Sequence, residues 1–251
     1  MVKKYIKKIL LKSKFIEKIA IFICINKNLF PKIFVNTSSN SIRNFLNLPY
    51  GENIAQLNQD IFALLINSFN PGYFLEIGAN DGFSLSNTVY LEDNFGWRGI
   101  LIEANPKYRN SLKNRKSIIV NKAITESNGV FQFTDAGLYG GLSETLDNTH
   151  GDITGKASVI NVDGCRLEDV LIENQAPKVI DFVSIDVEGG EFSILKQLCE
   201  LKNYRFKCGC VEHNYRGNDQ YIFKELLKNA GYSIYWEGST GHDLYFIDAS
   251  Q

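Results

Sequence analysis

From residue 73 onward, short apolar runs alternate with amphipathic helical patterns, and this alternation restricts the possible folds more than any other feature. The strand-like runs are Tyr73–Ile77, Gly99–Ile102, Ser117–Asn121, Phe182–Asp186, Cys208–Glu212, Tyr232–Tyr235 and Asp243–Ile247. Helical patterns fill most gaps, at about residues 85–95, 106–114, 166–173, 192–201 and 219–230. The alternation predicts an α/β fold in which a mostly parallel sheet carries helices on both faces.

Two regions depart from this alternation. Only residues 236–242 join the last two strands, which is too short for a helical crossover, so these strands should run antiparallel. Residues 125–164 hold two strand-like runs, 130–133 and 158–162, around a stretch rich in Gly, Thr and Asp. Because long irregular segments in compact domains are often functional, we expect this excursion to lie near the site.

The length and charge distribution suggest one domain with a distinct N-terminal extension. The chain has 251 residues, of which 44% are hydrophobic, enough for one substantial core. We predict a basic extension and linker over residues 1–50 and the main domain over 51–251. Residues 1–32 hold nine Lys and one Glu, whereas the rest holds 18 Lys and Arg against 27 Asp and Glu. An acidic body disfavours nucleic acid as a partner.

The basic segment within residues 1–25 has an amphipathic helical pattern, with Ile6, Ile9 and Ile16 on one side and lysines on the other. Its apolar run, 19–25, is too short to span a bilayer. The segment is compatible with peripheral contact with an anionic membrane surface, with packing on the body or a partner, or with a solvated helix. Five cysteines without a CxxC pair indicate reduced thiols and a cytoplasmic protein, with a possible location at the inner membrane face.

The stretch from Tyr73 to Glu103 has the layout of an adenosine site. One apolar strand ends in Glu76 and a turn containing Gly78 and Gly82, and the next strand ends in Glu103. The backbone can approach a ligand closely at glycine, and a carboxylate at the end of the second strand can accept hydrogen bonds from both ribose hydroxyls.

Polar and acidic residues also follow the later strands. Asp186 and Glu188 follow the fourth strand, while Glu212 and His213 end the fifth, and His242 opens the last. The chain contains no GxxxxGK[ST] loop, and the glycine turn holds no Lys or Arg for a pyrophosphate. An acidic lining therefore favours a cationic sulfonium ligand over a polyphosphate. The turn also lacks the GxGxxG pattern of a nicotinamide-dependent Rossmann oxidoreductase, which remains the alternative class.

Three motifs resemble the FkbM-type S-adenosylmethionine-dependent methyltransferases. They are Phe74–Gly82, Leu101–Pro106 and Asp181–Phe192, of which the third, with its Ile-Asp-Val-Glu-Gly core, is the most specific. The resemblance covers about residues 73–248. It implies a Rossmann-like class I methyltransferase fold with a seven-stranded sheet and a reversed last strand. It also implies methyl transfer from S-adenosylmethionine, usually to a hydroxyl of a sugar, polysaccharide or polyketide-like product.

By the same resemblance, Gly78 and Gly82 shape the cofactor turn, Glu103 takes the ribose hydroxyls and Ala123 lies by the adenine. We expect the cofactor site to include Glu76, Gly78, Asn80, Asp81, Gly82, Glu103, Ala104, Ala123, Asp186 and Glu188.

The chemical step needs a base, because an alcohol is a poor nucleophile at neutral pH. His213 is the first candidate because imidazole titrates near neutrality, followed by Asp186 and then His242. We also expect His213 and His242 to lie close together, at one edge of the sheet. The carboxylates could instead hold a divalent metal, but we favour a reaction without one. The acceptor itself, a glycan or another small molecule, has no readable signature, although residues 140–143 and 215–216 could line its site.

Overall fold

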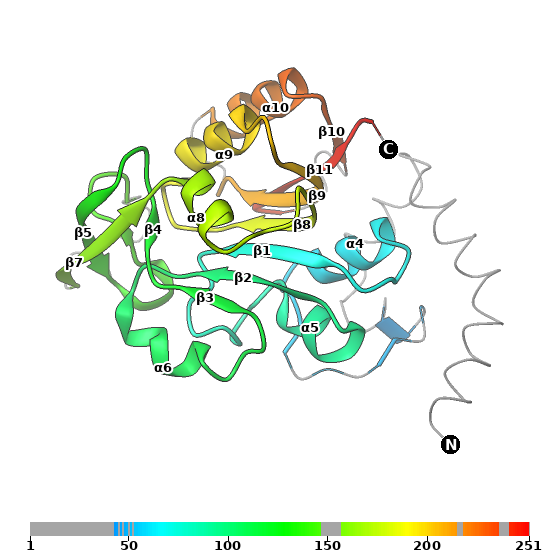
Figure 1. Cartoon of the computed structure of the whole chain (residues 1–251), viewed down its shortest axis with the longest axis horizontal. Coiled ribbons are helices and arrows are strands. Elements are labelled where there is room, and N and C mark those ends of the chain that lie inside the picture. The colour runs from blue at the N-terminus through cyan, green and yellow to red at the C-terminus, as the bar shows by residue number, and fades with distance from the viewer. Residues whose placement is uncertain are drawn as a thin grey trace.

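The computed structural model describes residues 43–44, 46, 48–49, 51, 53–146, 157–214, 218–235 and 241–250. They form a seven-stranded sheet flanked by helices, with a smaller four-stranded sheet beside it (Figure 1). The main strands are β1 (Tyr73–Ile77), β2 (Arg98–Ile102), β3 (Ile118–Val120), β8 (Val179–Ile185), β9 (Arg205–Glu212), β10 (Tyr232–Tyr235) and β11 (Asp243–Asp248).

The main sheet has the order β10-β11-β9-β8-β1-β2-β3. Neighbours from β9 to β3 pair in parallel, whereas β11 pairs antiparallel with both β9 and β10. The mostly parallel sheet with a reversed last strand is therefore confirmed, and the reversed strand is inserted rather than appended. The chain order switches between β1 and β8, where open α/β sheets bind their ligands.

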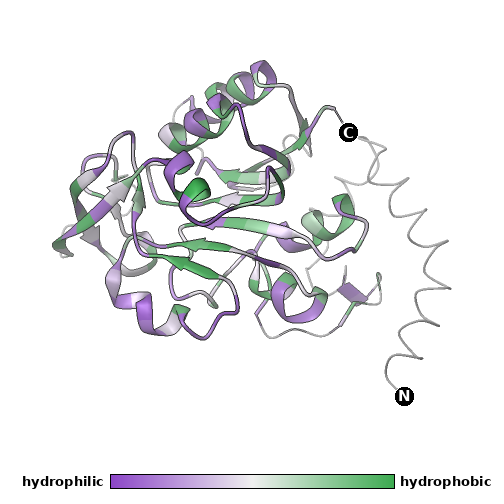
Figure 2. Ribbon diagram, viewed as in Figure 1, coloured by the Kyte–Doolittle hydropathy of each residue, from purple (hydrophilic) through white to green (hydrophobic). Residues whose placement is uncertain are grey.

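Helices cover both faces of this sheet, and two apolar clusters form the core. The helices are α4 (Gln59–Ile66), α5 (Val89–Phe95), α6 (Arg109–Leu112), α8 (Leu167–Glu173), α9 (Glu191–Glu200) and α10 (Asp219–Asn229). Along β1, Leu75 joins the cluster beneath α8, α9 and α10, whereas Phe74 joins the one beneath α4 and α5. This alternation follows from the two-residue period of a strand. The strands are mostly apolar, while α9 and α10 carry both apolar and polar stripes (Figure 2).

Part of the expected excursion forms its own sheet. The strands β4 (Ala123–Ile124), β5 (Gly129–Asp135), β6 (Gly141–Leu142) and β7 (Ser158–Cys165) assemble in the order β4-β7-β5-β6, which we call the small sheet. A 3-10 turn, η2 (Gly137–Tyr139), separates β5 from β6. Both predicted strand-like runs lie inside β5 and β7. Residues 147–156, from the Gly/Thr/Asp-rich stretch, lie outside the described residues.

The first helix after β1 starts later than its pattern predicts. The sequence pattern predicts a helix from about residue 85, but α5 begins at Val89. Leu85 has a φ of 58° and so cannot lie in a right-handed helix. Side-chain hydrogen bonds to Asp81 and Glu76 hold Ser84 and Ser86 on either side of it, and these tertiary contacts override helix propensity.

The predicted N-terminal boundary falls within a packed region. Arg43 is buried and pairs with Asp60 of α4 at 2.6 Å, and Leu46 and Leu48 pack on the α4–α5 cluster. The amphipathic segment within residues 1–25 lies outside the described residues, as do Tyr215 and Arg216. Among the described helices, none is long and apolar enough to cross a membrane.

Candidate active site

The glycine turn after β1 brings the ends of three strands together. The N–H groups of Gly78 and Ala79 both donate to the Ile102 carbonyl at the end of β2, at 2.9 and 3.0 Å. Gly78 has a φ of 90°. A Cβ atom on Gly78 would lie 1.6 Å from the carbonyl oxygen of Asp186, the residue that follows β8. Only glycine fits this approach. The turn thus occupies the switch point of the sheet.

Glu76 organises the chain that follows this turn. Its buried carboxylate accepts hydrogen bonds from the Ser86 hydroxyl, the Asn87 N–H at 2.8 Å and the Thr88 hydroxyl. The Arg115 guanidinium lies 4.0 Å away. Burial raises the pKa of Glu76, and Arg115 opposes that rise. Most of its acceptor sites are used by protein donors, which indicates that Glu76 shapes the cavity wall.

Glu103 is buried and holds the glycine turn from the end of β2. One carboxylate oxygen accepts the Asn80 N–H and the other the Asn105 N–H, both at 2.7 Å. Burial raises the pKa of Glu103, and these two N–H groups oppose the rise. Each oxygen keeps a second lone-pair site, as a ligand with two adjacent hydroxyls would require.

The other residues predicted in the turn divide into two groups. Asn80 lines the cavity beside Glu103. Asp81 instead accepts the Phe83 and Ser84 N–H groups at 2.8 and 2.7 Å, and so closes the turn itself. Asp81 and Gly82 are not among the described residues that line the cavity.

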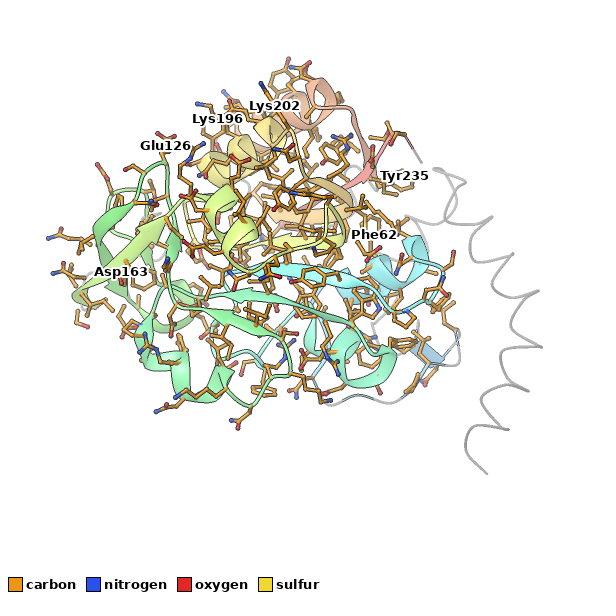
Figure 3. The ribbon with its side chains drawn as sticks, viewed as in Figure 1. Phe62, Glu126, Asp163, Lys196, Lys202 and Tyr235 are labelled. Atoms are coloured by element: carbon orange, nitrogen blue, oxygen red, sulfur yellow. The ribbon has the colours of Figure 1, made fainter. Side chains whose placement is uncertain are left out.

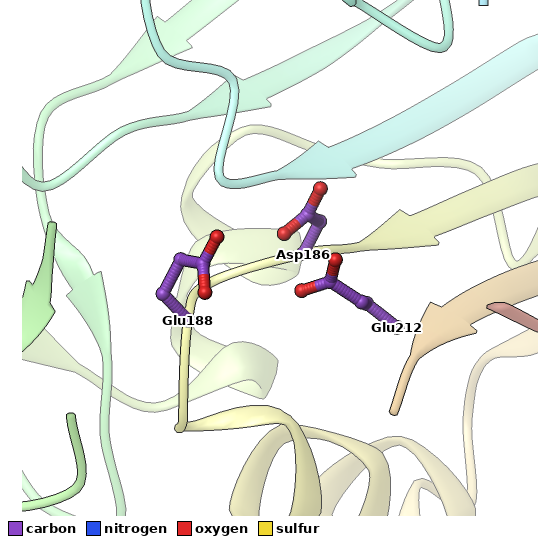
Figure 4. Close-up of side chains that lie close together, drawn as sticks. All are labelled: Asp186, Glu188 and Glu212. Carbon is purple, nitrogen blue, oxygen red and sulfur yellow. The ribbon is translucent and has the colours of Figure 1, made fainter. Parts of the chain in front are cut away.

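A row of carboxylates crosses three neighbouring strands. Ile185 pairs with Val211, so the next residues, Asp186 and Glu212, come opposite each other, and Glu212 pairs with Asp243. Carboxylate oxygens of Asp186, Glu188 and Glu212 lie within 4.8 Å of one another (Figure 4). Burial and the charges of Asp186 and Glu188 raise the pKa of Glu212 well above its usual range. The arrangement could alternatively hold a divalent cation.

The two histidines lie side by side, as expected, but only one reaches the cavity. The main-chain N–H of His213 donates to the main-chain carbonyl of His242 at 2.7 Å. The His213 residue is 1% exposed and does not line the cavity, whereas His242 is exposed and lines it. This difference favours His242 over His213 as a group that can meet a substrate.

A cavity of about 390 Å³ joins these parts, a size typical of small-molecule sites. Of the residues predicted for cofactor binding, Glu76, Gly78, Asn80, Glu103, Ala104, Ala123, Asp186 and Glu188 line it. Sequence reasoning missed Gln56 and Tyr108, and it also missed three residues that the excursion contributes, Phe133, Leu138 and Tyr139. Tyr108 lies two residues after the Leu101–Pro106 motif, in the 3-10 turn η1 (Pro106–Tyr108). No motif marks the other four residues, because their positions depend on how the small sheet and the segment before α4 pack. The predicted 140–143 loop does contribute Gly140 and Leu142.

Comparison with known proteins places the chain in a family. Residues 76–234 match the Methyltransferase FkbM domain. A comparison with curated protein sequences gives no significant match. Solved structures similar to the chain include an O-methyltransferase from Bacillus cereus in complex with SAH, at 14% identity and a TM-score of 0.43, covering 91% of this chain and 99% of that one.

A second similar structure is the precorrin-6y C5,15-methyltransferase from Geobacter metallireducens, at 14% identity and a TM-score of 0.41, covering 79% of this chain and 90% of that one. At this level of similarity neither structure bears on function, and the fold is assigned from the strand order. The domain match, which spans more than half of the chain, replaces the oxidoreductase alternative. The protein belongs to the FkbM family of S-adenosylmethionine-dependent methyltransferases and has their Rossmann-like class I fold.

Proposed function

We propose that this enzyme methylates a hydroxyl group of a sugar, polysaccharide or glycolipid precursor. One observation carries the proposal. A single cavity holds the glycine turn and Glu103 together with Asp186, Glu188, Glu212 and His242. The glycine turn and Glu103 suit the nucleoside part of the cofactor. The carboxylates and His242 suit a positive sulfonium and a reacting hydroxyl. When bound, S-adenosylmethionine supplies an electrophilic methyl group.

Gly78, Asn80, Glu103, Ala104 and Ala123 would hold the cofactor. Glu103 would accept the two ribose hydroxyls at the lone pairs that the Asn80 and Asn105 N–H groups leave open. Ala104 and Ala123 would lie along the adenine. The rigid turn would keep the nucleoside in one orientation, so that much of the rate comes from alignment of the reacting atoms.

The hydroxyl must lose its proton as the new C–O bond forms and the S–C bond breaks. We assign the proton acceptor to His242, with Asp186 as the second candidate, because both line the cavity. The main-chain N–H of His213, which is buried, would hold the His242 backbone in place, through a bond that does not involve the His213 side chain. The expected effect of His242→Ala is a loss of about 10²–10⁴-fold in turnover with unchanged S-adenosylhomocysteine binding. His213→Ala should lower turnover less, and the opposite ranking would return the role to His213.

We propose that this reaction proceeds without a metal ion. The support is that His242 and Asp186 both line the cavity, so that either can accept the hydroxyl proton without a cation to lower the pKa of the hydroxyl. Activity in EDTA, without stimulation by Mg²⁺, supports this assignment. A loss in EDTA that Mg²⁺ restores would instead place a cation at Asp186, Glu188 and Glu212.

The acceptor class is tested by incubating the full chain with S-adenosylmethionine labelled in the methyl group. The panel would hold free saccharides, nucleotide sugars, lipid-linked sugars and polyketide-like alcohols. Label transferred to a saccharide supports the proposal, and transfer only to polyketide-like alcohols would identify the alternative acceptor class. Glycosyltransferase genes beside the gene for this chain would add independent support.

We also propose that residues 1–25 make peripheral contact with an anionic membrane surface, at the cytoplasmic face where lipid-linked sugars are made. The support is the basic amphipathic pattern alone. Deleting residues 1–32 should abolish co-sedimentation with anionic liposomes. Undiminished co-sedimentation would remove the membrane contact from the proposal.

A further inference from the structure

A second hollow, with a volume of about 740 Å³, lies between the small sheet and the start of α9. Residues of β5, β6 and the 124–127 segment form one side, and Gly190 and Ser193 form the other. Ile124, Leu142 and Gly190 line both this hollow and the active-site cavity. The two spaces are therefore neighbours, and one extended ligand could occupy both.

Hydrogen bonds hold the walls of this hollow in place. On the small sheet, the Ser143 N–H donates to the Gln132 carbonyl at 2.9 Å, and the hydroxyls of Ser143 and Thr134 are 2.8 Å apart. The Gln197 amide of α9 donates to the Thr125 carbonyl at 3.2 Å. The Ser193 hydroxyl also reaches Glu126 at 3.5 Å, at the end of the small sheet that faces α9 (Figure 3). The hollow is thus largely preformed, which lowers the entropic cost of binding.

The lining suits a ligand that is neutral and rich in hydroxyl groups. It combines hydroxyls, one amide, two carboxylates and a short apolar strip, from Thr125, Glu126, Ser127, Val130, Phe131, Gln132, Ser143, Glu144, Thr145 and Ser193. Carboxylates are strong acceptors for ligand hydroxyls, and the apolar strip can meet C–H faces. Val130 is 68% exposed, so such a surface is available. The carboxylates of Glu126 and Glu144 would repel an anionic ligand.

We propose that this hollow, which we call the acceptor groove, binds the neutral sugar units of a glycan acceptor beyond the unit that receives the methyl group. The inference rests on the proposed function and deepens it. The active-site cavity binds the sugar unit with the reacting hydroxyl, and the groove selects acceptors that are chains rather than single sugars. Neutral sugar chains should therefore bind in the groove, and anionic sugar chains should not.

Saturation-transfer NMR on the full chain with saturating S-adenosylhomocysteine tests the groove. The probes are the neutral tetrasaccharides maltotetraose, cellotetraose and mannotetraose, their monosaccharides, and anionic tetragalacturonate. We expect at least one neutral tetrasaccharide to bind more tightly than its monosaccharide, with tetragalacturonate showing no binding. The double variant Glu126→Ala, Glu144→Ala should bind that tetrasaccharide about tenfold more weakly, and Glu200→Ala, an exposed change outside both hollows, should bind it normally.

The outcomes separate this inference from the function on which it rests. S-adenosylhomocysteine bound equally by all variants shows that the fold and cofactor site are intact. With that binding present, failure of every neutral tetrasaccharide to bind, equal binding by the double variant, or preference for tetragalacturonate would overturn the groove. If the unmodified chain bound no S-adenosylhomocysteine, the proposed function and the groove would both be overturned.

Discussion

The side-chain amide of Gln59 donates a 2.8 Å hydrogen bond to Oδ2 of Asp243, across 184 positions of sequence. Its own oxygen accepts the Leu57 N–H at 2.8 Å, which leaves the amide nitrogen facing Asp243. Both residues are buried, and both lie outside the range that matches the family domain. Since Asp243 pairs with Glu212, this contact fixes one end of the carboxylate row.

Gln59→Leu should destabilise the protein by about 1–3 kcal/mol, because it removes the donor to a buried carboxyl group. Denaturant unfolding followed by circular dichroism measures this change. Gln56→Leu is the matched control, since Gln56 is exposed three residues earlier and should change stability by about 0.5 kcal/mol or less. Equal effects of the two substitutions would contradict the bracing role.

Asp243→Asn should change how stability depends on pH. Burial and the Asp186 charge raise the pKa of Asp243 from 3.8 to about 7. The unfolded chain releases this proton near pH 4 and the folded protein only near pH 7, so this group makes stability fall as pH rises between these values. The variant lacks that fall. The difference in free energy of unfolding between the variant and wild type should therefore shift in favour of the variant by roughly 2–3 kcal/mol from pH 5 to pH 8. Denaturant midpoints at both pH values provide the measurement, and parallel pH curves would contradict the assignment.

Gly78→Ala and Gly96→Ala form a matched pair at positive φ. A Cβ at residue 78 would meet the Asp186 carbonyl at 1.6 Å, whereas one at residue 96 meets nothing within 4 Å. The expected cost at residue 96 is about 1 kcal/mol, from backbone conformation alone. At residue 78 we expect loss of the folded protein or of S-adenosylhomocysteine binding, measured by thermal shift with and without this ligand. Similar melting temperatures and similar binding for the two variants would contradict this prediction, because they would show that the ends of β1 and β8 can move apart.

Glu103→Ala should remove recognition of the ribose hydroxyls. For wild type, replacing S-adenosylhomocysteine by its 2′-deoxyribose analogue should weaken binding by about tenfold, the effect of one charge-assisted hydrogen bond. The variant should bind both ligands with similar, weaker affinity. Calorimetry of wild type and Glu103→Ala, each with both ligands, measures the coupling free energy between Glu103 and the ribose hydroxyl. A deoxy penalty that persists in Glu103→Ala would assign the hydroxyl contact to another residue.

Much of the main sheet could be predicted because its signals are local. The apolar run 73–77 predicts β1, and the glycines at 78 and 82 predict the turn that follows it, without reference to any distant residue. The start of α5 could not be predicted in this way, since its pattern continues through Leu85. Hydrogen bonds to Glu76 and Asp81 reshape that segment after the chain folds.

The alternation of strands and helices and the Asp181–Phe192 motif determined the fold class and the family, because periodicity and motif spacing are properties of the chain itself. Tertiary structure alone decided which histidine reaches the cavity, that Gln59 braces Asp243, and that the small sheet meets α9 at the acceptor groove. These relationships depend on which face of a strand or helix each side chain occupies after segments far apart in sequence have packed together.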